Sequence, residues 1–177
     1  MKDRGEFESR VLPHLDAAYN LARWLMRDER AAEDAVQEAA LRAFRYFGSL
    51  RGDGAKPWLL GIVRNTCFAM LERRRHTAEL SSVDAGVEID QIAQSDPTTD
   101  PAISLLRKDE RARVNAAIRA LPPHLREMIV LREIEGLDYA EIARVTEIPI
   151  GTVMSRLSRA REKLRAELLQ AGVRGSE

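Results

Sequence analysis

A stripe of hydroxyl and cationic side chains near the C-terminus has the chemistry needed to bind an anionic polymer. On a helix, Thr152, Arg156, Arg159 and Lys163 share one face. A separate face with the same spacing is apolar and suited to packing, and its residues are Val153, Leu157, Ala160, Leu164 and Leu168. Since arginine and threonine donate hydrogen bonds to phosphates and base edges, this pattern is typical of a helix that enters a DNA groove.

The segment before this helix predicts a partner helix and a short turn. Asp138 is suited to cap a helix that runs to Val145, with Glu141 three residues further on. A turn at residues 146–148 follows, and Pro149 suits the entrance of the next helix. Helix, turn and basic helix together indicate a helix-turn-helix. The alternative is an ordinary helical hairpin with a solvated charged face, but the single stripe of arginines and hydroxyls favours the helix-turn-helix.

A second group of cations lies in the N-terminal half. A glycine-rich loop at residues 48–57 precedes a helix expected from about Trp58 to Arg75. The cationic, amide and aromatic side chains of this segment are Arg51, Lys56, Trp58, Arg64, Asn65, Arg73, Arg74 and Arg75. Grouped around a single-stranded or distorted stretch of DNA, such side chains combine charge with base stacking.

Both features also have purely structural explanations. A tryptophan where a loop meets a helix is more often a core anchor than a stacking platform, so the core role is the first interpretation of Trp58. Arginines near a helix C-terminus are favoured by the helix dipole. Three arginines in succession, Arg73 to Arg75, exceed what the dipole needs, and their forked guanidinium groups suit phosphate oxygens.

Another amphipathic helix is expected from Glu33 to Phe47, after a first amphipathic pattern over residues 7–26. We expect its apolar face to consist of Val36, Ala40, Phe44 and Phe47. The opposite face carries Asp34, Gln37, Glu38, Arg42 and Arg45. Taken alone, this polar face is interpreted most simply as a solvated surface.

The composition predicts an all-α protein. Of 177 residues, 45% are hydrophobic and 5% aromatic, and Ala, Leu, Arg and Glu dominate. No apolar run approaches the roughly 18 residues that a membrane-spanning helix needs. The single cysteine, Cys67, cannot form an internal disulfide, which favours a cytoplasmic location. Its apolar helical surroundings predict a core position.

The residue types that support catalysis do not form a pattern. The three histidines, His14, His76 and His124, lie far apart in the sequence, and neither paired carboxylates nor metal-ligand spacing is found. We therefore expect no enzymatic activity, no cofactor and no metal site.

The charge distribution predicts two domains and a linker. Residues 1–76 and residues 107–177 each carry 14 Lys/Arg and 11 Asp/Glu, a net charge of +3. Residues 77–106 carry six acids and no Lys or Arg, a net charge of −6. Because this stretch is also rich in Ser and Pro, it is predicted to be a flexible acidic linker between two small, mildly basic helical domains.

The chain resembles the bacterial extracytoplasmic-function (ECF) sigma factors, the smallest class of the sigma-70 family, over nearly its whole length. Residues 31–44 resemble the core-polymerase-binding helix of the family, and residues 57–65 with Arg73–Arg75 resemble its promoter-melting and minus-ten segment. The segments similar to the second domain of the family are 121–127, 136–143 and 151–161. The polymerase-binding segment, the minus-ten segment and the second-domain segments follow one another in the order that the family has, and this order makes the resemblance specific.

The resemblance implies a role for each segment. Asp34, Gln37 and Glu38 would face the clamp-helix coiled coil of the largest subunit of core RNA polymerase. The loop at 48–57 and the cations after it would bind the minus-ten element of promoter DNA and capture a flipped base. The residues for the minus-thirty-five element would be Arg144, Thr152, Ser155, Arg156, Arg159 and Arg161. The family also implies an anti-sigma factor that holds the protein inactive, and a stress-response regulon.

Two positions depart from the family pattern, and two other functions stay open. Many relatives have glycine in the turn where this chain has Thr146 and Glu147, and a lysine is common at the position of Met154. The chain could instead be a sigma mimic that sequesters an anti-sigma factor, but a mimic does not need the arginines of both DNA faces. A helix-turn-helix repressor is the other alternative, and it leaves the helix at 58–75 unexplained.

Overall fold

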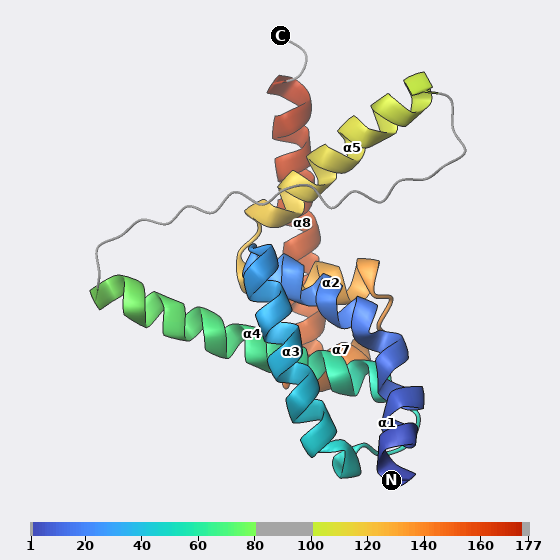
Figure 1. The fold of residues 1–177 in the computed structure, drawn as a ribbon. Helices are drawn as coiled ribbons and strands as arrows, with labels where there is room; N and C mark the ends of the chain where they lie inside the picture. Colours follow the sequence, from blue (N-terminus) through green and yellow to red (C-terminus); the bar gives the residue numbers. More distant parts are fainter. Residues whose placement is uncertain (1, 81–100, 175–177) are drawn as a thin grey trace.

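The computed structural model describes residues 2–80 and 101–174, and the whole of this part is helical or in short connections. Figure 1 shows the arrangement of the helices. The elements are α1 (Lys2–Val11), the 3-10 turn η1 (Leu12–His14), α2 (Leu15–Met26), α3 (Glu29–Arg45), the 3-10 turn η2 (Phe47–Ser49), α4 (Ala55–Leu80), α5 (Pro101–Ala120), α6 (Pro123–Ile129), the π-helical turn η3 (Val130–Ile134), α7 (Tyr139–Thr146) and α8 (Ile150–Arg174). The prediction of an all-α protein is confirmed.

The first amphipathic pattern forms two helices rather than one. Pro13 lies within η1, where its missing N–H and fixed φ favour a break between α1 and α2. The connection from α2 to α3 is short: Arg27 takes a left-handed conformation, with φ 56°, and ends α2. Asp28 then caps α3, because its side chain accepts a hydrogen bond from the backbone N–H of Ala31 at 3.2 Å.

Helix α3 packs through alanines, and the predicted apolar face was partly wrong. The fully buried residues of α3 are Ala31, Ala32, Ala35, Ala39 and Ala43. A row of small side chains lets α3 approach α2 and α4 closely, so the larger Phe44 is displaced to the edge and is 52% exposed. There its ring packs edge-on against Phe7, with 5.2 Å between ring centroids.

Helix occupies both ends of the stretch interpreted as a linker. Helix α4 continues to Leu80, and α5 begins at Pro101, so residues 77–80 and 101–106 are helical. The rest of the predicted linker, residues 81–100, lies outside the described part of the chain. In Figure 1 the C-terminal half of α4 and the N-terminal half of α5 both extend beyond the packed helices.

The C-terminal helices follow the predicted helix-turn-helix order. Asp138 and Glu141 form a capping box at the start of α7, with the Asp138 carboxylate 2.7 Å from the N–H of Glu141. Glu147 takes the left-handed conformation, φ 56° and ψ 36°, that ends α7 without a glycine. The carbonyl of Pro149 accepts hydrogen bonds from the N–H groups of Thr152 and Val153 at the start of α8.

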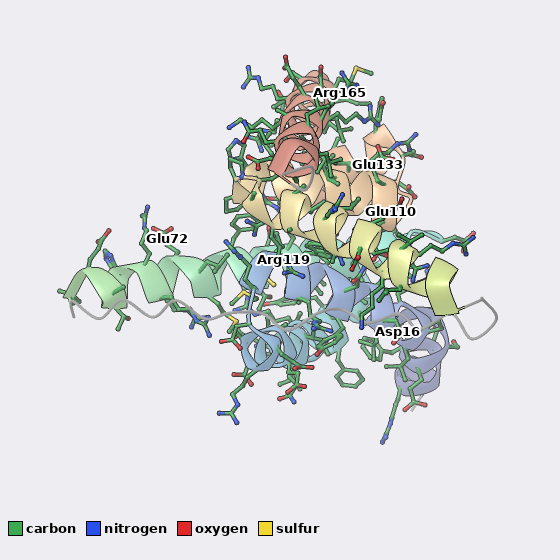
Figure 2. The ribbon with its side chains drawn as sticks, turned by 90° about the horizontal axis from the view of Figure 1, so that it is seen from above. Asp16, Glu72, Glu110, Arg119, Glu133 and Arg165 are labelled. Atoms are coloured by element: carbon green, nitrogen blue, oxygen red, sulfur yellow. The ribbon has the colours of Figure 1, made fainter. Side chains whose placement is uncertain are left out.

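The two groups of helices, α1–α4 and α5–α8, pack directly on each other. Helix α7 lies against the N-terminal half of α4, and α6 lies against α2. Arg126 of α6 is central to this contact: its buried guanidinium donates to the carbonyl of Trp24 in α2 and to the carbonyls of Ile118, Arg119 and Leu121 at the end of α5. Figure 2 shows α5 passing over α2, with Arg119 and Asp16 on the two helices.

Candidate nucleic-acid interface

Helix α8 presents its predicted polar face to solvent. Val153, Leu157 and Ala160 are buried at 0–1% exposure and anchor the helix on α6 and α7. On the other side Ser155 and Arg159 are exposed, and Thr152 and Arg156 are half-buried. The Ser155 hydroxyl donates to the carbonyl of Thr152 at 3.1 Å. Within the described residues, Arg156 and Arg159 make no side-chain hydrogen bond or ion pair, so both guanidinium groups are available to a ligand.

The other two predicted minus-thirty-five residues are Arg161 and Arg144. Arg161 is paired with a carboxylate, and Arg144 lies close to the N-terminal loop. Arg161 donates two hydrogen bonds to one carboxylate oxygen of Glu133, at 3.1 and 2.7 Å. This bond raises the pKa of the Arg161 guanidinium above its usual value. Arg144 is exposed on α7, and its Nη1 lies 4.0 Å from the position of a Cβ added to Gly54 in the N-terminal loop.

The predicted minus-ten residues at the start of α4 are engaged by the C-terminal helices. The Arg64 guanidinium binds the Glu127 carboxylate through two hydrogen bonds, Nε to Oε2 at 2.7 Å and Nη2 to Oε1 at 3.1 Å. The Glu127 side chain is completely buried and that of Arg64 is 18% exposed. The Lys56 ammonium donates to the backbone carbonyl of Glu135 at 2.8 Å and lies 3.3 Å from its carboxylate.

The remaining minus-ten candidates are more accessible. Arg51 and Asn65 are exposed, while Trp58 is half-buried and packs against the core, as expected for an anchor. Arg73, Arg74 and Arg75 are exposed on α4 and directly follow Glu72, which Figure 2 labels on the projecting part of this helix. Their acidic neighbours are Glu38 for Arg73, Asp28 for Arg74 and Glu72 for Arg75, at 3.8, 3.8 and 2.7 Å. Ion pairs this exposed contribute little stability and yield readily to a phosphate.

The predicted polymerase-binding residues lie on the outer face of α3. Asp34 and Gln37 are exposed, and the half-buried Glu38 pairs with Arg42 one turn later. Beside them, α1 and α3 enclose a largely apolar groove of about 590 Å³. Its apolar lining residues are Phe7, Leu12, Ala40, Leu41 and Phe44, and its polar ones are Arg4, Glu8 and Gln37.

Sequence reasoning missed three polar residues that join the two groups of helices. Arg126 and Glu127 sit in a run of buried residues, between Leu125 and Met128. A charged pair inside an apolar helix must find partners, and that signal was present in the sequence. Burial lowers the pKa of Arg126 to about 10, which leaves the side chain charged at neutral pH. Glu135 gave no comparable signal, because it looks like an ordinary surface residue after η3.

Other chemistry is not supported within the described part of the chain. Burial raises the pKa of the Cys67 thiol to about 12, so this core residue is unreactive, as expected. Residues 2–80 and 101–174 contain no cluster of His, Cys, Asp and Glu that could hold a metal ion. Among the same residues, none of the helices has the length and apolar character required to cross a bilayer.

Two family models match the chain in the expected order. Residues 11–77 match Sigma-70 region 2, and residues 111–164 match Sigma-70, region 4. The first match begins at the last residue of α1 and covers α2, α3 and nearly all of α4. The second match begins within α5 and ends within α8, so it includes the helix-turn-helix of α7 and α8. These two matches define a bacterial transcription initiation factor rather than an enzyme.

Curated relatives are similar over most of the chain. The RNA polymerase sigma-H factor of Pseudomonas aeruginosa is 36% identical over 92% of this chain and 86% of its own length. The ECF RNA polymerase sigma-E factor of Escherichia coli K12 is 38% identical over 74% of this chain and 70% of its own length. The chain belongs to the sigma-70 family and is an ECF sigma factor.

Solved structures show the same fold. The sigma factor RpoE of Bartonella quintana, determined in complex with the anti-sigma factor NepR, matches 93% of this chain and 97% of its own with a TM-score of 0.73 and 29% identity. CnrH, determined with the cytosolic domain of CnrY, matches 94% of this chain and 87% of its own with a TM-score of 0.60 and 28% identity. Both matches span α1–α4 and α5–α8 together.

Proposed function

We propose that this sigma factor binds core RNA polymerase through α3, binds the minus-ten element through the cations of α4 and the loop before it, and reads the minus-thirty-five element with α8. The observation that carries the proposal is the order of the two matched segments, each of which presents a polar face where its role requires one. Phosphates would be bound by Arg144, Arg159 and Arg161, and base edges would be read by Thr152, Ser155 and Arg156.

The polymerase interface is assigned to Asp34, Gln37 and Glu38. Their exposure on one side of α3, next to the apolar groove, supports this assignment. Aromatic and aliphatic surface of this kind, rimmed by polar groups, is typical of a protein interface. The protein would act in the cytoplasm on a stress-response regulon. An anti-sigma factor would hold it inactive, and the determination of the similar RpoE in complex with an anti-sigma factor supports this part of the proposal.

The affinity of the full chain for purified core polymerase tests this assignment. We expect Asp34→Ala and Glu38→Ala each to weaken binding, with Glu72→Ala as the charge-matched control on the projecting part of α4. Loss of an interfacial charge that pairs across the interface costs about 2 kcal/mol or more. An unchanged affinity for both α3 variants would remove the polymerase interface from this face.

A further inference from the structure

The loop proposed to capture a minus-ten base has few anchors of its own. Of residues 48–54, Leu50 and Gly54 are half-buried and the others are exposed. The backbone hydrogen bonds of this stretch join residues close in the sequence, such as the bond from the N–H of Leu50 to the carbonyl of Phe47 at 3.0 Å. A loop with so few contacts keeps one conformation only if a neighbouring element holds it.

Arg10 of α1 makes a contact of this kind. Its Nη2 donates a hydrogen bond to the backbone carbonyl of Gly52, 42 positions further along the chain. Within residues 2–80 and 101–174, this is the one hydrogen bond that joins residues 48–54 to a helix distant in the sequence. Gly52 has φ 60°, a backbone conformation that glycine adopts without steric cost. A hydrogen bond from a charged donor is stronger than one from a neutral donor, so Arg10 is the main external anchor of the loop.

The same guanidinium lies over the ring of Phe47, the first residue of η2, where the chain enters the loop. The Cζ atom of Arg10 is 5.9 Å from the ring centroid, within the range of a cation–π contact. The Nη1 atom of Arg10 also donates to the carboxylate of Glu6, one turn earlier in α1, at 3.4 Å. Arg10 therefore binds the chain at two points, Phe47 and Gly52. The planar fork of arginine suits three simultaneous contacts, which the single ammonium of lysine does not.

Phe7 and Val11 fix the position of α1, and with it the position of Arg10. The Phe7 ring packs edge-on against Phe44 and Phe47, with 5.2 and 5.4 Å between ring centroids. Edge-to-face contacts between aromatic rings are directional, so they set how α1 lies against α3 and η2. Phe7 and Val11 are buried, at 7% and 0% exposure, whereas the Arg10 side chain is 29% exposed. The core thus holds the backbone of Arg10 while its side chain reaches the loop.

We propose that Arg10 is a positioning residue for promoter recognition: by binding Gly52 and covering Phe47, it holds the loop at 48–57 in one conformation and so sets the base selectivity of the minus-ten interaction. The proposal rests on the proposed minus-ten function of this loop. A preformed loop binds its matched base without first being ordered, and it adapts to other bases less well than a flexible loop does. Arg10 acts through Gly52 and Phe47 rather than by contacting DNA.

Hydrogen exchange of the free full chain, followed by mass spectrometry, tests whether Arg10 holds the loop, whatever the loop binds. Arg10→Met keeps an unbranched side chain and removes both the donor and the charge. We expect the amides of residues 47–58 to exchange about threefold faster or more in this variant, and those of α3 to be unchanged. Arg113→Gln is the charge-matched control, because Arg113 is exposed on α5, in the other group of helices. It should leave loop exchange at the wild-type level.

Base selectivity is measured with holoenzyme assembled from core RNA polymerase and each full-length variant. A random pool of short single-stranded DNA oligonucleotides is bound, and the bound fraction is sequenced. We expect Arg10→Met to lower the enrichment of the preferred base about threefold or more, with the affinity for core polymerase unchanged. Arg10→Lys restores one donor and a cation over Phe47, so it should recover about half of the lost enrichment or more. Thermal unfolding monitored by circular dichroism verifies that each variant is folded.

Wild-type loop exchange in Arg10→Met would overturn the proposal, because the loop would then be held without Arg10. Unchanged base enrichment in a variant whose loop exchanges faster would also overturn it, since loop conformation would not set selectivity. Equal losses of enrichment in Arg10→Met and Arg113→Gln, or no recovery in Arg10→Lys, would contradict the specific contact with Gly52 and Phe47. If the wild-type holoenzyme enriches no base, the minus-ten function of the loop fails and the proposal fails with it, while loop exchange and polymerase affinity still test the Arg10 contact and the polymerase interface separately.

Discussion

The two surfaces proposed to bind DNA differ in how the free chain uses their cations. On α8, Arg156 and Arg159 have no side-chain partner within the described residues. On the first half of α4, Arg64 and Lys56 are bound by carboxylates of the opposite group of helices. Both surfaces have the residue types that nucleic-acid binding needs. The difference shows that residue type defines a binding surface, whereas packing decides whether it is available.

The largest expected effect is a loss of stability from a substitution on the buried side of α8, because this side anchors the helix that carries Arg156 and Arg159. Leu157→Ala should lower the free energy of unfolding of the C-terminal helices by about 2–5 kcal/mol, because it leaves a cavity at a 1% exposed position. Met154→Ala, at a 49% exposed position of the same helix, is the control and should change it by less than about 0.5 kcal/mol. Denaturant unfolding of the full chain measures both, and equal effects would mean that α8 is packed differently.

The next prediction concerns the exposed surface of α8 and separates base contacts from phosphate contacts. If Arg156 makes a bidentate base contact, Arg156→Ala should cost about 1–3 kcal/mol of binding free energy at the matched promoter and less on altered minus-thirty-five sequences. If Arg159 binds a phosphate, as proposed, Arg159→Ala should weaken binding equally on all sequences. Holoenzyme binding to a set of promoter variants measures this difference. A uniform loss for Arg156→Ala would place that side chain on the phosphates as well.

A double-mutant cycle tests the ion pair on the first half of α4, where Arg64 is bound by Glu127. Arg64→Ala, Glu127→Ala and the double variant should show a coupling energy of about 1–3 kcal/mol in the stability of the full chain, because either single change leaves the other charge without its partner. The same cycle between Arg73 and Glu38, which are 3.8 Å apart and exposed, should give a smaller coupling than the covered pair. Coupling no larger for Arg64 and Glu127 than for the exposed pair would contradict the shielded contact.

The smallest expected effect is a gain in stability from substitutions in the turns that end α2 and α7. One of these turns lies in each group of helices. Arg27→Gly and Glu147→Gly should each stabilise the chain by about 0.5–1 kcal/mol, because glycine adopts the left-handed conformation at φ 56° without steric cost. Thermal unfolding measures the gain. A loss of stability in Glu147→Gly would show that its side chain makes a stabilising contact.

Much of the fold followed from local sequence chemistry. The capping box of Asp138 and Glu141, the basic helix after Pro149 and the core position of Cys67 were all predicted from residue spacing, and the structure confirms them. The apolar face of α3 was wrong because periodicity weights Phe44 above the alanines, whereas close helix packing favours the alanines. The break between α1 and α2 lies at Pro13, inside the first amphipathic pattern, and the missing N–H of proline explains it.

The sequence predicted which residues form the candidate DNA-binding surfaces. It did not predict which of them are paired with carboxylates of the same chain. The family pattern assigned the cations of α4 and α8 from sequence, and their roles remain predictions. The carboxylate that pairs with Lys56 comes from Glu135, 79 positions further along the chain, and the one that pairs with Arg64 comes from Glu127, 63 positions further. Pairing over such separations depends on how the two groups of helices meet, and no periodicity within one helix carries that information.

Run-off transcription is the most direct test of the account. Purified core RNA polymerase would transcribe sheared genomic DNA from the source organism with and without the full chain. We predict discrete new transcripts whose start sites share two upstream elements, one for α4 and one for α8. An absence of new start sites, with the same polymerase shown to be active with another sigma factor, would contradict the account.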